Sequence, residues 1–155
     1  MKSFKLSHIV DNGLIAALYV TLSLITYPLS FGMIQFRFAE ILMLLCFFRK
    51  DFAIGLILGC AITNIASFSP LDILFGTLAT GLSCIAIMFL KHLILAAIMP
   101  VIFNAIIIGL ELHYLLEEPL FVAIGFVALG EFVVMAVGYL IFMLLKKNRK
   151  IFELM

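Results

Sequence analysis

Charged residues are scarce in this chain, and their scarcity excludes an ordinary soluble domain. Only 12% of the 155 residues are Asp, Glu, Lys or Arg, whereas 66% are hydrophobic. Soluble domains contain roughly 25% charged and about 45–50% apolar residues. A soluble core cannot enclose so much apolar surface, so the composition predicts an all-α integral membrane protein.

Several patterns that carry chemistry are also missing. The three cysteines form no CxxC pair and lie in apolar runs, which favours small buried side chains over a disulfide or a metal site. His8, His92 and His113 are scattered at the ends of apolar runs, without metal-ligand spacing. No glycine-rich phosphate loop is present. The sequence therefore predicts a protein that is not an enzyme and that has no metal or cofactor of its own.

Six hydrophobic runs follow one another, each bounded by polar or turn residues. The second and third are shorter than the roughly 20 residues that a spanning helix needs, so we expect local thinning of the bilayer around them. We predict a single domain, residues 1–155, with six transmembrane helices. The six runs are residues 13–27, 38–48, 52–66, 73–90, 93–112 and 119–145.

The basic residues indicate an orientation. With six spans and the N-terminus inside, every Lys and Arg except Arg37 falls on the inner side. Cytoplasmic loops are enriched in Lys and Arg, so both termini are expected to be cytoplasmic. Four or five spans would scatter these residues over both sides. The outer side collects acidic residues, of which Glu111, Glu117 and Glu118 fall at a predicted loop, where we expect them to be solvated.

Polar side chains within the spans form the second signal. Charge inside a bilayer costs at least about 2.5–3.5 kcal/mol, so such side chains usually face a cavity or each other. Asn104 and Glu131 are expected at similar depth, roughly 16–18 Å into two adjacent antiparallel helices. We therefore expect an outward-facing recognition pocket. Its candidate residues are Gln35, Arg37, Glu40, Asn64, Asp72, Asn104 and Glu131.

These candidates have structural alternatives. Glu131 can be a neutral carboxyl group that bonds to a neighbouring helix. Arg37 and Glu40 are three residues apart and can simply pair with each other. Asp72 can cap the helix that follows Pro70, and the two asparagines can join helices by hydrogen bonds. For Glu131 we favour a functional role, because it is deep and has no basic partner in its span.

Small residues on the first run suggest a docking face. Gly13 and Ala17 are four residues apart, with Ala16 beside them, and this spacing lets another helix approach closely. We expect this face to dock a partner protein. The same spacing at Gly55 and Gly59 favours packing within the bundle.

Five segments resemble the QueT family, the substrate-binding S-components for queuosine precursors in energy-coupling factor (ECF) transporters. They run through the second to sixth predicted helices, and the most specific are the Phe-Arg-x-x-Glu and Leu-Asp-x-x-Phe-Gly-Thr-Leu-Ala-Thr pieces. The small-residue face of the first run is similar to the alanine motif with which such proteins dock the coupling subunit, although Gly13 replaces one alanine. The five segments are residues 36–40, 59–64, 69–80, 100–105 and 130–131.

The resemblance implies an S-component-like bundle in the bacterial cell membrane. Such a subunit captures its substrate outside and then associates with a membrane coupling subunit and two cytoplasmic ATPases. ATP would be used by those partner ATPases, which is consistent with the missing phosphate loop. No nucleic acid partner is implied.

A 7-deazaguanine base suits the candidate residues. Its adjacent N–H donors fit a carboxylate, for which we expect Glu131 or Glu40, and amides can bind its remaining polar atoms. Asp72 is the candidate for a cationic aminomethyl group, and Phe75 is a candidate for stacking on the ring. Arg37 would orient Glu40, and residues 27–35 would form a gating loop.

Three alternatives stay open at this point. The chain could be an S-component for another vitamin, an ion-coupled secondary transporter, or a structural membrane protein without a ligand. The residues also leave open whether the ligand is the aminomethyl base, its nitrile precursor or queuine.

Overall fold

The structure is a computed structural model that describes residues 6–30, 34–67 and 69–147. Over these ranges the chain consists of helices and short connections, so the all-α prediction is confirmed for this part of the chain. The helices are α1 (Leu6–Ile25), α2 (Tyr27–Ser30), η1 (Phe38–Leu44), α3 (Leu45–Phe48), η2 (Lys50–Phe52), α4 (Ala53–Ile65), α5 (Pro70–Phe89), α6 (Leu93–Leu116) and α7 (Leu120–Lys147), where η marks 3₁₀ helices.

Four of these helices are long and apolar enough to cross a membrane, namely α1, α5, α6 and α7. The second and third predicted spans correspond to the η1–α3 segment, Phe38–Phe48, and to the 13-residue helix α4. Each of these is roughly 20 Å long, against about 30 Å for the hydrocarbon core of a bilayer. A multi-pass membrane protein is therefore supported, and the count of six spans stays a prediction.

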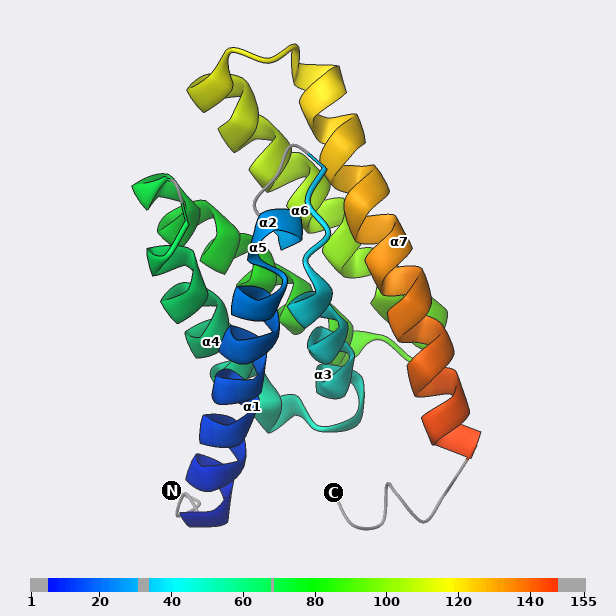
Figure 1. Ribbon diagram of the computed structural model, residues 1–155. Coiled ribbons are helices and arrows are strands. Elements are labelled where there is room, and N and C mark those ends of the chain that lie inside the picture. Colours follow the sequence, from blue (N-terminus) through cyan, green and yellow to red (C-terminus); the bar gives the residue numbers. More distant parts are fainter. Residues whose placement is uncertain (1–5, 31–33, 68, 148–155) are drawn as a thin grey trace.

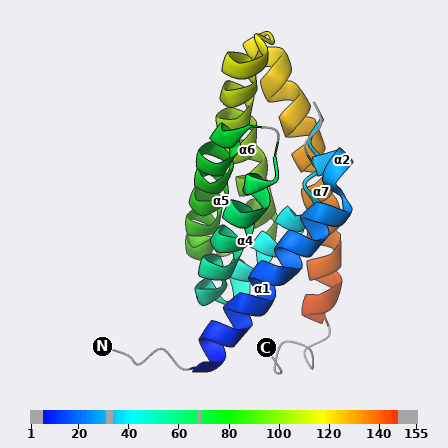
Figure 2. The ribbon, with the colours of Figure 1, turned by 60° about the vertical axis from the view of Figure 1, so that its left-hand side comes forward.

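The long helices surround the short η1 segment. Helix α1 packs on α4, α4 on α5, α5 on α6 and α6 on α7, and η1 contacts all five of these helices (Figure 1). In both views the α6–α7 hairpin extends beyond the rest of the bundle at one end (Figures 1 and 2). The η1–α3 segment contributes fully buried residues such as Met43, Leu44 and Cys46 to the apolar core.

Glycines allow α1 and α4 to pack closely. A Cβ atom at Gly55 would lie 2.5 Å from the backbone oxygen of Asn12, and one at Gly59 would lie 3.0 Å from that of Ala16. Asn12 also accepts a hydrogen bond from the Gly55 amide at 2.7 Å. The expected packing role of these two glycines is confirmed.

The described basic residues other than Arg37 lie at one end of the bundle. Helix α1 begins and α7 ends there (Figures 1 and 2). The ammonium group of Lys50 lies 5.5 Å from the ring centre of Phe89, and that of Lys146 lies 5.7 Å from the ring centre of Phe47. The segregation of basic residues expected from the sequence therefore exists in the described part of the fold, and the membrane face that this end occupies stays a prediction.

Helix α5 begins earlier than expected. Pro70 is its first residue rather than a turn residue before it, because proline fits the first position of a helix. Ser69 is the N-cap, and its hydroxyl oxygen accepts a hydrogen bond from the Leu71 amide. The capping alternative for Asp72 is therefore wrong, and Asp72 lies in the first turn.

Candidate functional site

A buried group of polar side chains lies where the chain enters η1. We call it the polar cluster, and its side chains come from η1, from the segment before it, and from α4, α6 and α7. The chain reaches it in an irregular segment, residues 34–37, which contacts Leu29 of α2 and Gly130 of α7. The polar cluster consists of Gln35, Arg37, Glu40, Asn64, Asn104 and Glu131.

Glycine 130 positions the segment that carries Gln35 and Arg37. A Cβ atom at Gly130 would overlap with the backbone carbonyl group of Gln35, so only glycine leaves room for this approach to α7. On the other side, the Phe36 amide donates to the backbone oxygen of Leu29 at 2.8 Å. The residue after Gly130 is Glu131, and the same close approach therefore brings Glu131 to the polar cluster.

Arg37 joins η1 to α4 within the polar cluster. Its side chain is 5% exposed. One guanidinium nitrogen lies 3.3 Å from Glu40 Oε1, and another donates to Asn64 Oδ1 at 3.4 Å. The expected pairing with Glu40 is therefore present, and Arg37 also fixes the orientation of the Asn64 amide.

Asn64 extends this network to α5. Its Nδ2 group donates to the backbone oxygen of Asp72 at 2.9 Å and approaches Cys60 Sγ at 3.3 Å. A Cβ atom at Gly76 would lie 2.5 Å from Asn64 Nδ2, so glycine at this position leaves space for the amide. Asp72 is thus connected to Arg37 through a single asparagine.

Two carboxyl groups meet at the centre of the polar cluster. Glu40 is 0% exposed, and its second oxygen accepts a hydrogen bond from Asn104 Nδ2. Glu131 is also 0% exposed, and its carboxyl group lies close to that of Glu40. Neither oxygen of Glu131 has a hydrogen-bond partner of ordinary geometry among the described residues.

The atoms left without partners share one chemical character. Within the described part of the polar cluster they are both oxygens of Glu131, Oδ1 of Asn104 and Oε1 of Gln35. Carboxylate and amide oxygens accept hydrogen bonds. A buried acceptor without a donor costs about 1–3 kcal/mol, so the site is suited to a ligand that presents several N–H groups.

Most of the predicted binding residues come together in this cluster. The exceptions are Asp72, which reaches it through Asn64, and Phe75, which is half-buried on the same helix, α5. The expected gating segment is described only in part. Its residues 27–30 form α2, and residues 31–33, Gly32 among them, lie outside the described residues.

The predicted location of Glu111 is wrong. It was expected in a solvated loop, but α6 continues to Leu116 and buries Glu111 to 3% exposure. Its carboxyl group lies beside that of Asp72, and neither of its oxygens has a described hydrogen-bond partner. The spacing in the sequence predicts this burial, because Glu111 is seven residues after Asn104 and therefore lies on the same face of the helix.

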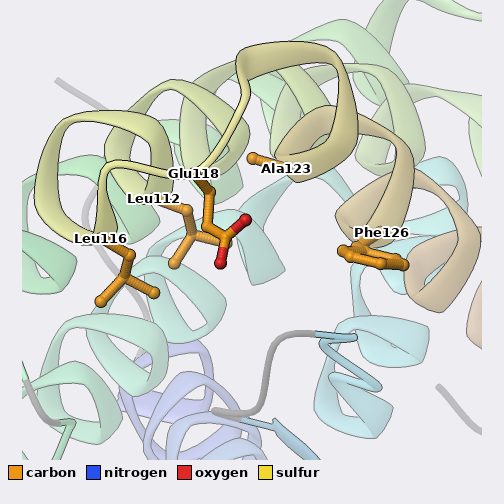
Figure 3. Close-up of a pocket in the computed structure, with 5 residues that line it drawn as sticks. All are labelled: Leu112, Leu116, Glu118, Ala123 and Phe126. Atoms are coloured by element: carbon orange, nitrogen blue, oxygen red, sulfur yellow. The ribbon is translucent and has the colours of Figure 1, made fainter.

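A cavity between α6 and α7 does not belong to the polar cluster. Figure 3 shows Leu112, Leu116, Ala123 and Phe126 around it, with the Glu118 side chain directed toward the same space. Its volume of about 10 Å³ corresponds to a single water molecule. It is too small for a heterocyclic ligand.

The three residues of the predicted docking face differ in their surroundings. Ala16 packs against Gly59 of α4, within the bundle. Gly13 and Ala17 are exposed, and no described atom lies within 4 Å of a Cβ atom built at Gly13. The outward part of this face therefore consists of Gly13 and Ala17, and its role in docking stays a prediction.

Long apolar helices around a buried polar cluster define a polytopic membrane protein with the features of a transporter. Residues 9–147 match the family model described as "QueT transporter", so the chain belongs to the QueT transporter family. It is 35% identical over 154 residues to the protein named "Queuosine precursor transporter QueT" of Lactococcus lactis subsp. cremoris (strain MG1363), a match that covers 89% of this chain and 91% of the relative. No solved structure matches the chain.

Proposed function

We propose that this chain is the substrate-capture subunit of an ATP-driven ECF importer and that it binds a queuosine precursor of the 7-deazaguanine type. The observation that carries the proposal is the set of buried acceptor atoms without partners in the polar cluster. The printed name of the Lactococcus relative supports the same substrate class.

The base would bind through its guanine-like edge. Its N1–H and 2-amino groups would donate to the two oxygens of Glu131, a charge-assisted pair of hydrogen bonds. Asn104 uses its amino group on Glu40, so it would offer Oδ1 to another ring N–H. Arg37 would hold Glu40 in place, and Asn64 would hold Arg37. Phe75 is the candidate for contact with the ring face.

Entry to the site requires movement of the elements that cover it. The polar cluster is buried, with Glu40, Asn104 and Glu131 at 0% exposure. We expect the segment that contains Gln35 to move away from Gly130 when a base enters, because the two backbones are in contact. The gating role proposed for residues 27–35 rests on this contact.

The transport cycle would involve three partner proteins in the bacterial cell membrane. The proposed orientation has six spans, with both termini in the cytoplasm and with access to the polar cluster from the outside once the covering segment has moved. A membrane coupling subunit would dock on the α1 face at Gly13 and Ala17. Two cytoplasmic ATPases would use ATP, so this chain would need no cofactor of its own.

Thermal stability in the presence of ligands tests the substrate class. The purified chain in detergent is heated with the aminomethyl base, its nitrile precursor and queuine in turn. The proposal expects a concentration-dependent rise in Tm with at least one of them. No rise with any of the three would contradict it and would favour a different vitamin or a protein without a ligand.

An ion-coupled secondary transporter is the second candidate, because buried carboxyl groups such as Glu40 and Glu131 also occur in proton-coupled carriers. Liposomes that contain this chain alone distinguish the two. The proposal expects no uptake by this chain without its coupling module and ATP. Uptake driven by an ion gradient in the absence of other proteins would establish the secondary carrier instead.

A further inference from the structure

Glu111 is a buried carboxylate to which the proposed recognition of the guanine edge gives no role. It lies on α6, is 3% exposed, and leaves both oxygens without a described hydrogen-bond partner. A titratable neighbour of Glu111 is Asp72, in the first turn of α5. Two acidic side chains from adjacent helices therefore lie side by side in the interior of the bundle.

Glu111 lies beyond Asn104 along α6, toward the connection between α6 and α7. Glu111 follows Asn104 by seven residues, which places it two helical turns or about 10.5 Å away on the same face of α6. Asp72 is connected to the cluster through Asn64, which donates to the Asp72 backbone oxygen and accepts from Arg37. The acidic pair and the polar cluster thus form one continuous polar region.

The chemistry of the pair indicates a cationic ligand group. Glu111 presents two acceptor oxygens and no donor when ionised. A buried charge without a partner is expensive in a low-dielectric interior, and an ammonium group supplies both the opposite charge and three donors. The separation from Asn104 is comparable with the length of a bicyclic base that carries a one-carbon amine arm.

We infer that Glu111, together with Asp72, binds the charged amine of the substrate and makes the protein select an aminomethyl-7-deazaguanine over the nitrile form. The inference rests on the proposed function, because it needs the ring to bind at Asn104 and Glu131. It adds a residue that determines specificity to the same site.

Calorimetric titration in detergent tests the inference with three ligands. They are the aminomethyl base, the nitrile base and 7-deazaguanine without an arm. The variant Glu111→Gln keeps the shape of the side chain and removes its charge, and Glu117→Gln makes the same change at an exposed residue as a control. We expect Glu111→Gln to bind the aminomethyl base at least tenfold more weakly and the two uncharged bases as tightly as the wild type does. Glu117→Gln should bind all three like the wild type.

Three outcomes would overturn the inference. In the first, Glu111→Gln binds the aminomethyl base like the wild type, which leaves the proposed function intact. In the second, Glu111→Gln weakens binding of the armless base as much as binding of the aminomethyl base. This result would show that Glu111 does not act on the amine. The third needs no variant: the wild type binds the aminomethyl and armless bases equally. A wild type that binds none of the three would contradict the proposed function itself.

Discussion

At the scale of single residues, one guanidinium group organises two carboxyl groups and an amide. Arg37 bonds to Glu40 and Asn64, and Glu40 also accepts from Asn104. The region contains four buried acidic side chains, Glu40, Glu131, Asp72 and Glu111, and Arg37 is the cation at its centre. A donor-rich, cationic ligand would complete this balance of charge and hydrogen bonds.

Removing the guanidinium should destabilise the fold. Arg37→Met leaves the buried Glu40 carboxylate without its cation, which typically costs about 3–5 kcal/mol. The double variant Arg37→Met with Glu40→Met should recover much of this loss, because both charges are then absent. Unfolding in detergent measures both effects, with Lys91→Met at an exposed site as the control. A single variant as stable as the wild type would show that Arg37 has no such role.

The site was only partly predictable from the sequence. Polar residues within or beside the apolar runs stand out, so the sequence alone identifies the members of the polar cluster. Glu111 was missed because its neighbours Glu117 and Glu118 suggested a loop, whereas packing of α6 on α7 extends the helix to Leu116. The sequence left open whether Asp72 caps α5, because Ser69, which is the N-cap in the structure, is also a residue type that caps helices.

At the scale of elements, the site depends on how closely an irregular segment approaches a helix. The segment before η1 contacts α7 at Gly130, and η1 itself packs against the surrounding long helices. Hydrophobic runs predicted the helices well, and the short run 38–48 coincides with η1 and α3. Hydrophobicity could not predict that η1 is a 3₁₀ helix at the centre of the bundle, because that depends on tertiary packing.

A methyl group at Gly130 should disrupt this approach. Gly130→Ala places its Cβ atom against the Gln35 carbonyl group, and overpacking of this kind costs about 1–3 kcal/mol. Gly125→Ala is the matched control on the same helix, because no described atom lies within 4 Å of its Cβ position. Gly125→Ala should be neutral or stabilising by up to about 1 kcal/mol, since alanine favours helices. Equal melting temperatures for the two variants would contradict the contact.

The loop between α3 and α4 should contribute a pH-dependent term to stability. Asp51 lies 2.7 Å from Arg49 and 2.8 Å from His8. The hydrogen bond from Arg49 lowers the Asp51 pKa to about 2, with a further contribution from His8. Because this pKa is below its ordinary value near 4, the stabilisation is fully present above about pH 4 and is lost as the pH falls toward 2.

Melting temperatures of the wild type and Asp51→Asn between pH 7 and pH 3 measure this term. The wild type should melt at a higher temperature than Asp51→Asn. This difference in melting temperature should be constant from pH 7 to about pH 5 and should become smaller below pH 4. A difference that grows on acidification has the opposite sign and would exclude the proposed stabilisation by the ionised carboxylate.

At the scale of the whole molecule, basic residues are concentrated at one end of the long axis of the bundle. Described basic residues other than Arg37 gather at one end, and Glu117 and Glu118 lie at the α6–α7 connection, at the other end. With the basic end in the cytoplasm, the positive-inside rule places the α6–α7 connection outside. The η1–α3 segment and α4 are shorter than the hydrocarbon core of a bilayer is thick. They therefore span the membrane only if the bilayer becomes thinner around them, and the sequence does not encode that thinning.

Cysteine labelling tests this topology. The native Cys46, Cys60 and Cys84 are 0% exposed, so background labelling by a membrane-impermeant maleimide should be low. Glu117→Cys should react in intact cells, whereas Lys91→Cys should react only after permeabilisation. Reaction of both from the same side, or the reverse pattern, would refute six spans with cytoplasmic termini.

The most direct test of the central claim is a calorimetric titration of the wild type and Glu131→Gln with the aminomethyl-7-deazaguanine base. The proposal predicts saturable binding to the wild type. It also predicts at least about 100-fold weaker binding to a folded Glu131→Gln, because hydrogen bonds to a charged acceptor contribute about 1.5–3 kcal/mol each. Wild-type affinity in Glu131→Gln, with unfolding unchanged, would contradict the assignment of the polar cluster as the substrate site.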